Sequence, residues 1–344
     1  MSYVFPGRLL PILEYVAAVL VLSREDVQAV LDLDRLVDAV AAAMVDLSQG
    51  RADVPTRIAT FVAERQGLLA AMPAFLPSAG SLTTKLVSLF PQNADLPTHH
   101  AIIACFDPAT GMPTALMDGT YITAARTAAG SALATKLLSR SGSAVVSILG
   151  TGVQGHAHAL ALSRLPGVEV IEVAGRDPAK VVALRNQLSE AGIPVETAAS
   201  IEAAVRSADV VCATTHAAEP VVHRAWLRPG THVNSVGYNM TGAGEVDTDT
   251  VRDSVVVVES RDAVLAAPPS GAVELHRAID AGVIKPDHIH AELGELVSGD
   301  RPGRTDDTQL TLYKSVGVAV QDAAAAALVL ESARERGIGH DIEL

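Results

Sequence analysis

The sequence is short of aromatic side chains, which make up 3% of its 344 residues and include a single tryptophan. Sites that stack sugar rings or the bases of single-stranded nucleic acid depend on such side chains, so the composition argues against both ligands. Positive charge is also scarce, with 26 Lys and Arg against 39 acidic residues and a net charge of −13. Neither nucleic acid nor an anionic membrane surface is therefore the expected partner.

Cysteine is rarer still. Cys105 and Cys212 form neither a metal-ligand spacing nor a disulfide framework, which suits a reducing compartment. A membrane span needs about 20 unbroken apolar residues, and the apolar stretch near the N-terminus is interrupted by Glu14. We expect a cytoplasmic protein without a metal site, in which residues 1–20 are an N-terminal extension, either a translated leader or an extra packing segment.

Hydrophobic residues are plentiful at 49%, and the length suits two domains. Ser23 is a helix N-cap candidate, and apolar residues recur with a helical period over 32–49. Residues 51–118 contain short apolar runs separated by proline and glycine, which predicts strands and turns in a mixed sheet. An alanine-rich helix is expected over 123–138.

From residue 144 onward, Val- and Ile-rich strands alternate with amphipathic helices. This alternation is typical of a parallel sheet covered on both faces, so the fold class is α/β with a doubly wound sheet. The strands are expected at 144–149, 168–175, 194–198, 208–215, 231–237 and 254–260, and the helices at 157–165, 178–191, 200–207 and 307–336.

A glycine turn follows the first of these strands and opens a helix. In that context a G-x-G-x-x-G run predicts a dinucleotide site, because its backbone N–H groups and the helix N-terminus approach a pyrophosphate closely. The alternative is a tight turn without a ligand. The candidate cofactor-binding residues are Gly150, Thr151, Gly152, Val153, Gln154 and Gly155, together with Thr214 and Gly237 at the ends of two later strands.

The tip of the second strand bears on cofactor choice. NAD enzymes usually place an acidic residue there for the ribose 2′-hydroxyl, but Glu172 lies inside the strand and Asp177 is placed to cap the next helix. Arg176 offers a planar fork for a 2′-phosphate, or it is simply a solvated loop charge. NADP(H) is favoured over NAD(H).

Four stretches, at 117–138 (MDGTYITAARTAAGSALATKLL), 148–162, 232–247 and 292–326, together resemble the ornithine cyclodeaminase/μ-crystallin family. The resemblance extends from about Val21 to the C-terminus. It implies a homodimer with an α+β substrate and dimerisation domain, built from both chain ends over 21–125 and 310–344. A Rossmann domain is expected over 126–309.

The resemblance also implies a substrate site formed by Arg57, Lys85, Thr98 or His99, and Arg126, in which the Arg and Lys side chains hold an α-carboxylate. Lys85 lies in an apolar strand, where an unpaired ammonium would be costly, and a guanidinium such as that of Arg126 matches a carboxylate bidentately. The alternative is a structural ion pair. His99 is a candidate for proton transfer or part of an ordinary polar turn.

The sequence departs from the family after Gly237, where Asn239 occupies a position that many members fill with Asp. Asn239 can form hydrogen bonds but cannot accept a proton. Glu245 and Asp247 match a Glu-x-Asp segment of the family, which we interpret as structural support. The candidate catalytic residues are Lys85, Arg126, His99 and Asn239.

These features favour NAD(P)H-dependent reduction of small α-imino acids such as Δ1-pyrroline-2-carboxylate, or the reverse amino-acid dehydrogenation, by hydride transfer at the α-carbon. The cofactor supplies this chemistry, and the protein supplies orientation and charge. The alternatives are ornithine cyclodeamination, which yields proline and ammonia, and a non-catalytic crystallin-like protein that binds NADP(H). Lys85, His99 or a bound water is the candidate proton donor.

Overall fold

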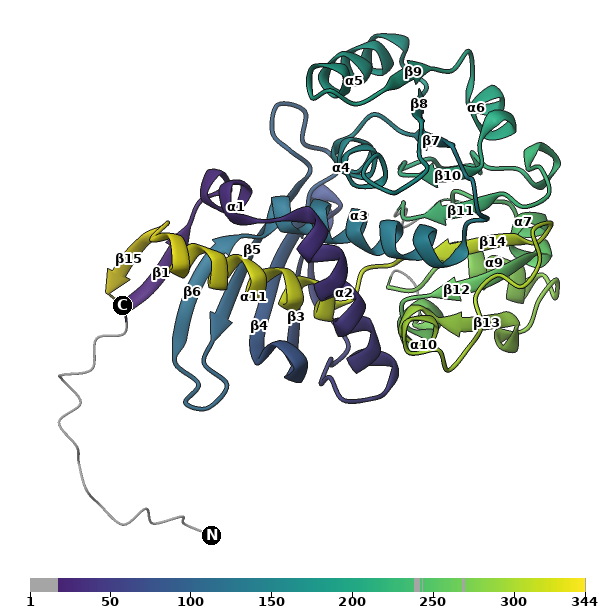
Figure 1. Cartoon of the computed structure of the whole chain (residues 1–344). Coiled ribbons are helices and arrows are strands. Elements are labelled where there is room, and N and C mark those ends of the chain that lie inside the picture. The colour runs from purple at the N-terminus through teal and green to yellow at the C-terminus, as the bar shows by residue number, and fades with distance from the viewer. Residues whose placement is uncertain (1–17, 238–241, 243, 268–269, 344) are drawn as a thin grey trace.

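The computed structural model describes residues 18–237, 242, 244–267 and 270–343, and these form two sheets with helices packed around them (Figure 1). The first sheet has the strand order β15-β1-β6-β5-β4-β3-β2. Its strands are β1 (Ala18–Leu22), β2 (Ile58–Val62), β3 (Gly67–Leu76), β4 (Ser81–Leu89), β5 (His99–Phe106), β6 (Pro113–Asp118) and β15 (His340–Glu343). Only β1 and β6 pair in parallel, so the sheet is mixed, as expected.

The second sheet is parallel and has the order β13-β12-β14-β11-β10-β7-β8-β9. Its strands are β7 (Val145–Leu149), β8 (Val170–Ala174), β9 (Val195–Thr197), β10 (Val210–Ala213), β11 (His232–Ser235), β12 (Ser254–Val258), β13 (Ile289–Glu292) and β14 (Leu310–Lys314). From β9 to β14 this is the Rossmann order, with the crossover point between β7 and β10. The predicted α/β fold with a doubly wound sheet is confirmed.

The helices pack against both sheets and leave one face of the first sheet uncovered (Figure 1). They are α1 (Arg24–Val30), α2 (Leu33–Ser48), α3 (Gly119–Leu138), α4 (Val153–Leu162), α5 (Pro178–Glu190), α6 (Ile201–Ser207), α7 (Thr248–Asp253), α8 (Arg261–Leu265), α9 (Val273–Asp280), α10 (Leu293–Ser298) and α11 (Ala319–Arg336). Ser23 caps α1 as predicted, and Asp32 caps α2. The alanine-rich α3 begins at Gly119 rather than at residue 123, because the Asp118 carboxylate accepts a hydrogen bond from the backbone of Tyr121.

The expectation of one helix over 307–336 was wrong. Residues 310–314 form β14, which lies fully buried between β11 and β12, and α11 begins at Ala319. The sequence Leu-Thr-Leu-Tyr favours a strand in that environment, and Gly317, with φ of 78°, separates strand from helix. The chain therefore leaves the second sheet after Lys314.

Helix α3 joins the two domains and lies between the sheets in Figure 1. It contacts α2, α11 and β5 of the first domain and α4 of the second. Its many Ala, Gly and Ser residues are buried, which lets neighbouring helices approach its backbone closely. Within the described ranges, no helix combines the length and apolar character needed to cross a membrane.

The two faces of the first sheet differ. The face formed by alternate residues of β4, from Ser81 to Val87, is buried against α11 and α3, and the Ser81 hydroxyl donates to the backbone oxygen of Ala323 on α11. The opposite face exposes Ile58, Leu69 and Ile102, whose exposed fractions are 71%, 51% and 45%. We name these three residues the outer-sheet patch.

Candidate active site

The structure brings two of the predicted site residues, Lys85 and Arg126, to one carboxylate. Lys85 Nζ lies 2.7 Å from Oδ2 of Asp322, and Arg126 Nε donates to Oδ1 at 3.0 Å. Arg126 Nη1 also donates to the side-chain oxygen of Gln321 at 2.9 Å. The Lys85, Arg126 and Asp322 side chains are at most 5% exposed. We call these three residues the buried charge cluster.

Three elements build the buried charge cluster. The alternation of β4 turns Lys85 toward the helices, since it shares the buried face with Thr83 and Val87. Arg126 lies on α3, and Asp322 lies in the first turn of α11. The structural ion pair considered from the sequence is therefore present, with Asp322 as its acidic member.

Sequence reasoning missed Asp322. A signal was present, because Asp322 directly precedes five consecutive alanines in α11, and an acidic residue in an apolar helix is rarely buried without a partner. Sequence alone does not show that α11 lies against β4 and α3.

Arg57 approaches the same region from the other side. Its Nη2 donates to the backbone oxygens of Val316 at 3.2 Å and Gly317 at 2.8 Å, in the turn between β14 and α11. A Cβ at Gly317 would fall 3.0 Å from Arg126 Nη2. Glu259 holds this turn from the second domain, since its carboxylate accepts from the backbone N–H groups of Val316 and Gly317. Arg57 and Arg126 therefore both lie beside Gly317, in the turn between β14 and α11.

The charges around Lys85 set its acidity. Burial lowers the pKa of Lys85 to about 8, with Asp322 opposing this shift and Arg126 adding to it. Burial would by itself raise the pKa of Asp322, but Lys85 and Arg126 outweigh it and keep the carboxylate ionised. At neutral pH the cluster therefore holds two cations and one anion.

His99 and Thr98 are placed differently. His99 begins β5, and burial together with the Lys85 and Arg126 cations lowers its pKa to about 4. The imidazole is therefore neutral at pH 7, which disfavours it as an acid. Thr98 is exposed, and its backbone oxygen accepts from the N–H of Phe90. The Thr98 side chain forms no hydrogen bond with other described residues.

The glycine turn has the geometry of a phosphate cradle. Gly150 has φ of 118°, and a Cβ at Gly155 would fall 2.1 Å from the Gly150 backbone oxygen, so both positions require glycine. A Cβ at Gly152 would meet nothing within 4 Å, and no side chain caps α4, whose first N–H groups stay open to a ligand. The apolar Val153 in this first turn is 68% exposed. These residues fit a dinucleotide pyrophosphate.

The strand tip beside this turn matches the sequence-based expectation. Asp177 caps α5 through the N–H groups of Ala179 and Lys180, and Glu172 accepts from Ser147. Arg176 is exposed and forms no ion pair or hydrogen bond with the described part of the chain.

Two more of the predicted residues, Thr214 and Gly237, lie at the carboxyl edge of the same sheet. Thr214 donates from its hydroxyl to the Leu149 backbone oxygen and touches the glycine turn, with Oγ1 2.8 Å from a Cβ built on Gly150. Gly237 follows β11 and donates its N–H to Glu245 at 2.6 Å. Asn239 lies outside the described residues.

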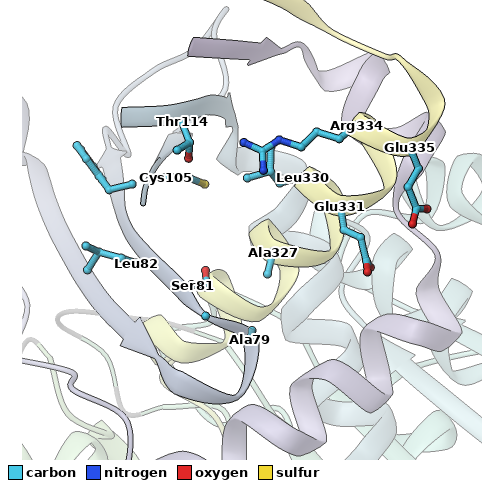
Figure 2. A pocket seen from close by; sticks show the side chains of 12 residues that line it. Ala79, Ser81, Leu82, Cys105, Thr114, Ala327, Leu330, Glu331, Arg334 and Glu335 are labelled. Carbon is cyan, nitrogen blue, oxygen red and sulfur yellow. The ribbon is translucent and has the colours of Figure 1, made fainter. Parts of the chain in front are cut away.

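A cavity of about 430 Å³ lies elsewhere, between α11 and the ends of β4, β5 and β6. Figure 2 shows Arg334 and Leu330 of α11 facing Cys105 and Thr114 across it. None of the predicted site residues lines this cavity.

The model of the ornithine cyclodeaminase/mu-crystallin family matches residues 18–337. The chain belongs to this family. The ketimine reductase mu-crystallin of Mus musculus is 37% identical over 317 residues, which are 90% of this chain and 96% of the mouse protein.

Solved structures of family members share the whole fold. The Thermococcus litoralis Δ1-pyrroline-2-carboxylate reductase, in complex with NADH and L-proline, is 38% identical with a TM-score of 0.89, covering 94% of this chain and all of the other. An archaeal alanine dehydrogenase dimer with bound NAD is 31% identical with a TM-score of 0.87, covering 95% and 99%. The family resemblance predicted from the four sequence stretches is confirmed.

Proposed function

We propose that this protein is an NAD(P)H-dependent reductase of small α-imino acids, ketimines such as Δ1-pyrroline-2-carboxylate, which also oxidises the corresponding amino acids in reverse. The observation that carries the proposal is the excess of positive charge where the domains join. Lys85, Arg126 and Arg57 converge there, with Asp322 as the carboxylate of the buried charge cluster. A buried surplus of cations is a site for an anion, and an α-imino acid carries a carboxylate.

The relatives support the reaction class. The mouse relative is a ketimine reductase and the Thermococcus litoralis structure holds NADH and L-proline. Arg126 and Arg57 bind and orient the substrate carboxylate, and the ammonium of Lys85 lies within the same charge cluster. When bound, the reduced nicotinamide supplies a hydride to the carbon of the C=N bond.

Proton delivery falls to Lys85. Hydride addition to a C=N carbon is easiest when the nitrogen is protonated, so the site needs a donor near the operating pH. With a pKa of about 8, Lys85 is charged at neutral pH and still able to give up its proton, whereas His99, with a pKa of about 4, is already neutral. Asp322 keeps the Lys85 side chain in place.

The glycine turn from Gly150 to Gly155 holds the pyrophosphate, and Thr214 and Gly237 line the nicotinamide half of the crevice. NADP(H) is the preferred cofactor, because the strand tip offers Arg176 and no free carboxylate: Asp177 is engaged in capping α5.

The protein acts as a homodimer that buries the outer-sheet patch of Ile58, Leu69 and Ile102. Apolar side chains exposed this strongly on one sheet face are typical of an interface. A second copy of the chain is the occupant that the family favours, since the archaeal alanine dehydrogenase relative is a dimer.

One assay tests the function. Consumption of NADPH and NADH is followed with Δ1-pyrroline-2-carboxylate, with Δ1-piperideine-2-carboxylate, and with pyruvate plus ammonia. Consumption with a cyclic imine supports ketimine reduction, and consumption only with pyruvate plus ammonia identifies an alanine dehydrogenase. Conversion of ornithine to proline without net change in cofactor would make the protein a cyclodeaminase. Cofactor binding without turnover on any of these would leave a crystallin-like binding protein.

A further inference from the structure

Glu245 ties together two strand ends at the carboxyl edge of the Rossmann sheet. Its side chain is buried, with the residue 2% exposed. Oε1 accepts from the backbone N–H and the hydroxyl of Thr215, which follows β10, and Oε2 accepts from the N–H of Gly237, which follows β11. The Ser235 hydroxyl also donates to Oε2, at 3.2 Å. One carboxylate therefore satisfies donors from both loops.

The Glu245 carboxylate accepts backbone hydrogen bonds just beyond the point where the pairing of β10 and β11 ends. The β10–β11 register ends with the pair Ala213 and Ser235. Beyond it, the N–H groups of Thr215 and Gly237 turn to Glu245 instead of to the neighbouring strand. A Cβ at Gly237 would fall 2.2 Å from Cδ of Glu245 and 2.3 Å from the Thr215 backbone oxygen, so the groups are in close contact. Glu245 thus sets the spacing between the loops.

Two further buried charges, Glu274 and Lys314, lie next to Glu245, and Lys314 acts on it through Glu274 and Gly237. Oε1 of Glu274 accepts from the Glu245 backbone N–H at 3.0 Å and from Lys314 Nζ at 3.1 Å, and Lys314 Nζ also donates to the Gly237 backbone oxygen at 3.2 Å. Burial raises the pKa of Glu245, while Lys314 and backbone donors outweigh burial at Glu274 and lower its pKa. The ammonium therefore neutralises part of the buried acidic charge.

The place of this network links cofactor to substrate. Thr215 directly follows Thr214, which contacts the glycine turn. Lys314 ends β14, and the chain continues from it into the turn that Arg57 holds through Val316 and Gly317. In a Rossmann sheet the second mononucleotide half lies over these later strands. The network therefore connects the glycine turn with the turn at Val316 and Gly317 that Arg57 contacts.

We propose that Glu245, held by Glu274 and Lys314, is a positioning residue that fixes Thr215 and Gly237, which follow β10 and β11, on either side of the nicotinamide. It touches neither cofactor nor substrate; it acts through Thr215 and Gly237. This inference rests on the proposed function, because it assigns Glu245 to the cofactor geometry of that same site.

The test is Glu245→Gln. The glutamine amide group is a donor, so it faces the N–H of Thr215 or Gly237 and leaves one loop without its acceptor. We expect turnover at saturating imine to fall on the order of 100-fold, the cost of a misplacement of about 1 Å. The fluorescence anisotropy of bound NADPH falls as the nicotinamide loosens. The NADPH dissociation constant stays unchanged, because the glycine turn is untouched.

Asp209→Asn is the matched control. The Asp209 carboxylate is also buried and accepts from two backbone N–H groups, those of Ala144 and Val145, but at the opposite end of β10. Asp209→Asn should lower the melting temperature but leave the anisotropy of bound NADPH and the turnover per folded molecule unchanged. If Glu245→Gln does not fold, Thr215→Val is the alternative test of the positioning role. This variant removes the hydroxyl that donates to Glu245 and should also lower the anisotropy of bound NADPH.

The outcomes separate this inference from the proposed function. Equal anisotropy and turnover in Glu245→Gln and Asp209→Asn would reduce Glu245 to a structural residue and overturn the inference. If the unmodified protein binds NADPH but reduces no imine, the proposed function fails, and lowered anisotropy in Glu245→Gln still supports the positioning role. Absence of NADPH and NADH binding by the unmodified protein would overturn both.

Discussion

The Nζ atom of Lys85 lies 2.7 Å from Oδ2 of Asp322, and both side chains are only 2% exposed. The other oxygen of the same carboxylate accepts from Arg126. One anion is thus shared by two cations in a buried place, which leaves a positive charge for a substrate carboxylate to balance. This arrangement determines how the site should respond to pH and to substitution.

The first prediction concerns pH. The pKa of Lys85 is about 8, so the ammonium is present below that pH and lost above it. Because the neutral amine neither donates a proton nor attracts a carboxylate, kcat/KM for imine reduction should be constant toward neutral pH and fall above about pH 8. This alkaline limb of the pH profile should lie at higher pH for kcat than for kcat/KM, because the bound substrate carboxylate stabilises the Lys85 ammonium. Steady-state pH profiles measure both.

Two variants test the assignment of that limb. Lys85→Arg keeps the positive charge with a guanidinium that does not titrate in this range. The alkaline limb should therefore be absent from the pH profile of this variant. Asp322→Asn removes an attraction that holds the proton on Lys85, so the limb should move below pH 8. A limb that stays in place in both variants would belong to another group.

The second prediction concerns the carboxylate clamp, by which we mean the binding of the substrate carboxylate by Arg126 and Lys85. Arg126→Ala should lower kcat/KM, and the loss should correspond to about 2–5 kcal/mol of transition-state stabilisation, the scale for truncating one side of a buried charge pair. Cofactor affinity, measured by titration, should hardly change. Arg164→Ala is the control, because Arg164 is exposed and pairs with Asp34. A bound substrate analogue lying away from Arg126 and Lys85 in a crystal structure would refute the clamp.

The third prediction concerns cofactor choice. Arg176→Ala should weaken NADPH binding by about 10- to 150-fold, which corresponds to one charge-assisted contact of roughly 1.5–3 kcal/mol. NADH binding should be unaffected, since it has no 2′-phosphate. Arg206→Ala, which removes an exposed arginine paired with Glu202, should change neither. Equal losses for both cofactors in Arg176→Ala would show that Arg176 does not contact the 2′-phosphate.

The fourth prediction concerns assembly. Ile102→Asp or Leu69→Asp places a charge in the outer-sheet patch and should convert the dimer to a monomer, because a buried unpaired carboxylate is costly. Size-exclusion chromatography with light scattering measures the mass. Val182→Asp is the matched control, since Val182 is 44% exposed on α5, much like Ile102 at 45%. A dimer that persists in Ile102→Asp and Leu69→Asp would place the interface elsewhere.

The fifth prediction separates reduction from cyclodeamination and depends on Asn239. To cyclise ornithine, an enzyme must deprotonate the δ-ammonium, whose reference pKa lies near the lysine value of about 10.4. Asn239 is no base, and base assistance is typically worth about 10²–10⁴-fold. The unmodified protein should therefore form little or no proline from ornithine, and Asn239→Asp should gain some of that activity, measured as proline and ammonia released. Efficient proline formation by the unmodified protein would favour the cyclodeaminase assignment instead.

The sequence by itself determined the local elements and the type of cofactor site. The Val-rich strands that alternate with helices after residue 144, and the turn from Gly150 to Gly155, predict a parallel sheet with a phosphate cradle because both depend on neighbours in the chain. Capping by Ser23 and Asp177 was predictable for the same reason. The family was also evident from the four stretches.

The tertiary structure decided which charges meet. Asp322 is far from Lys85 and Arg126 in the sequence, and only the packing of α11 against β4 and α3 brings its carboxylate to both. Whether residues 310–314 form a strand or continue a helix depended likewise on the gap between β11 and β12 that they fill. Local propensity is weak beside such burial, and the pKa values of Lys85 and His99 depend on desolvation and on charges from other elements. The site chemistry is therefore a property of the folded chain.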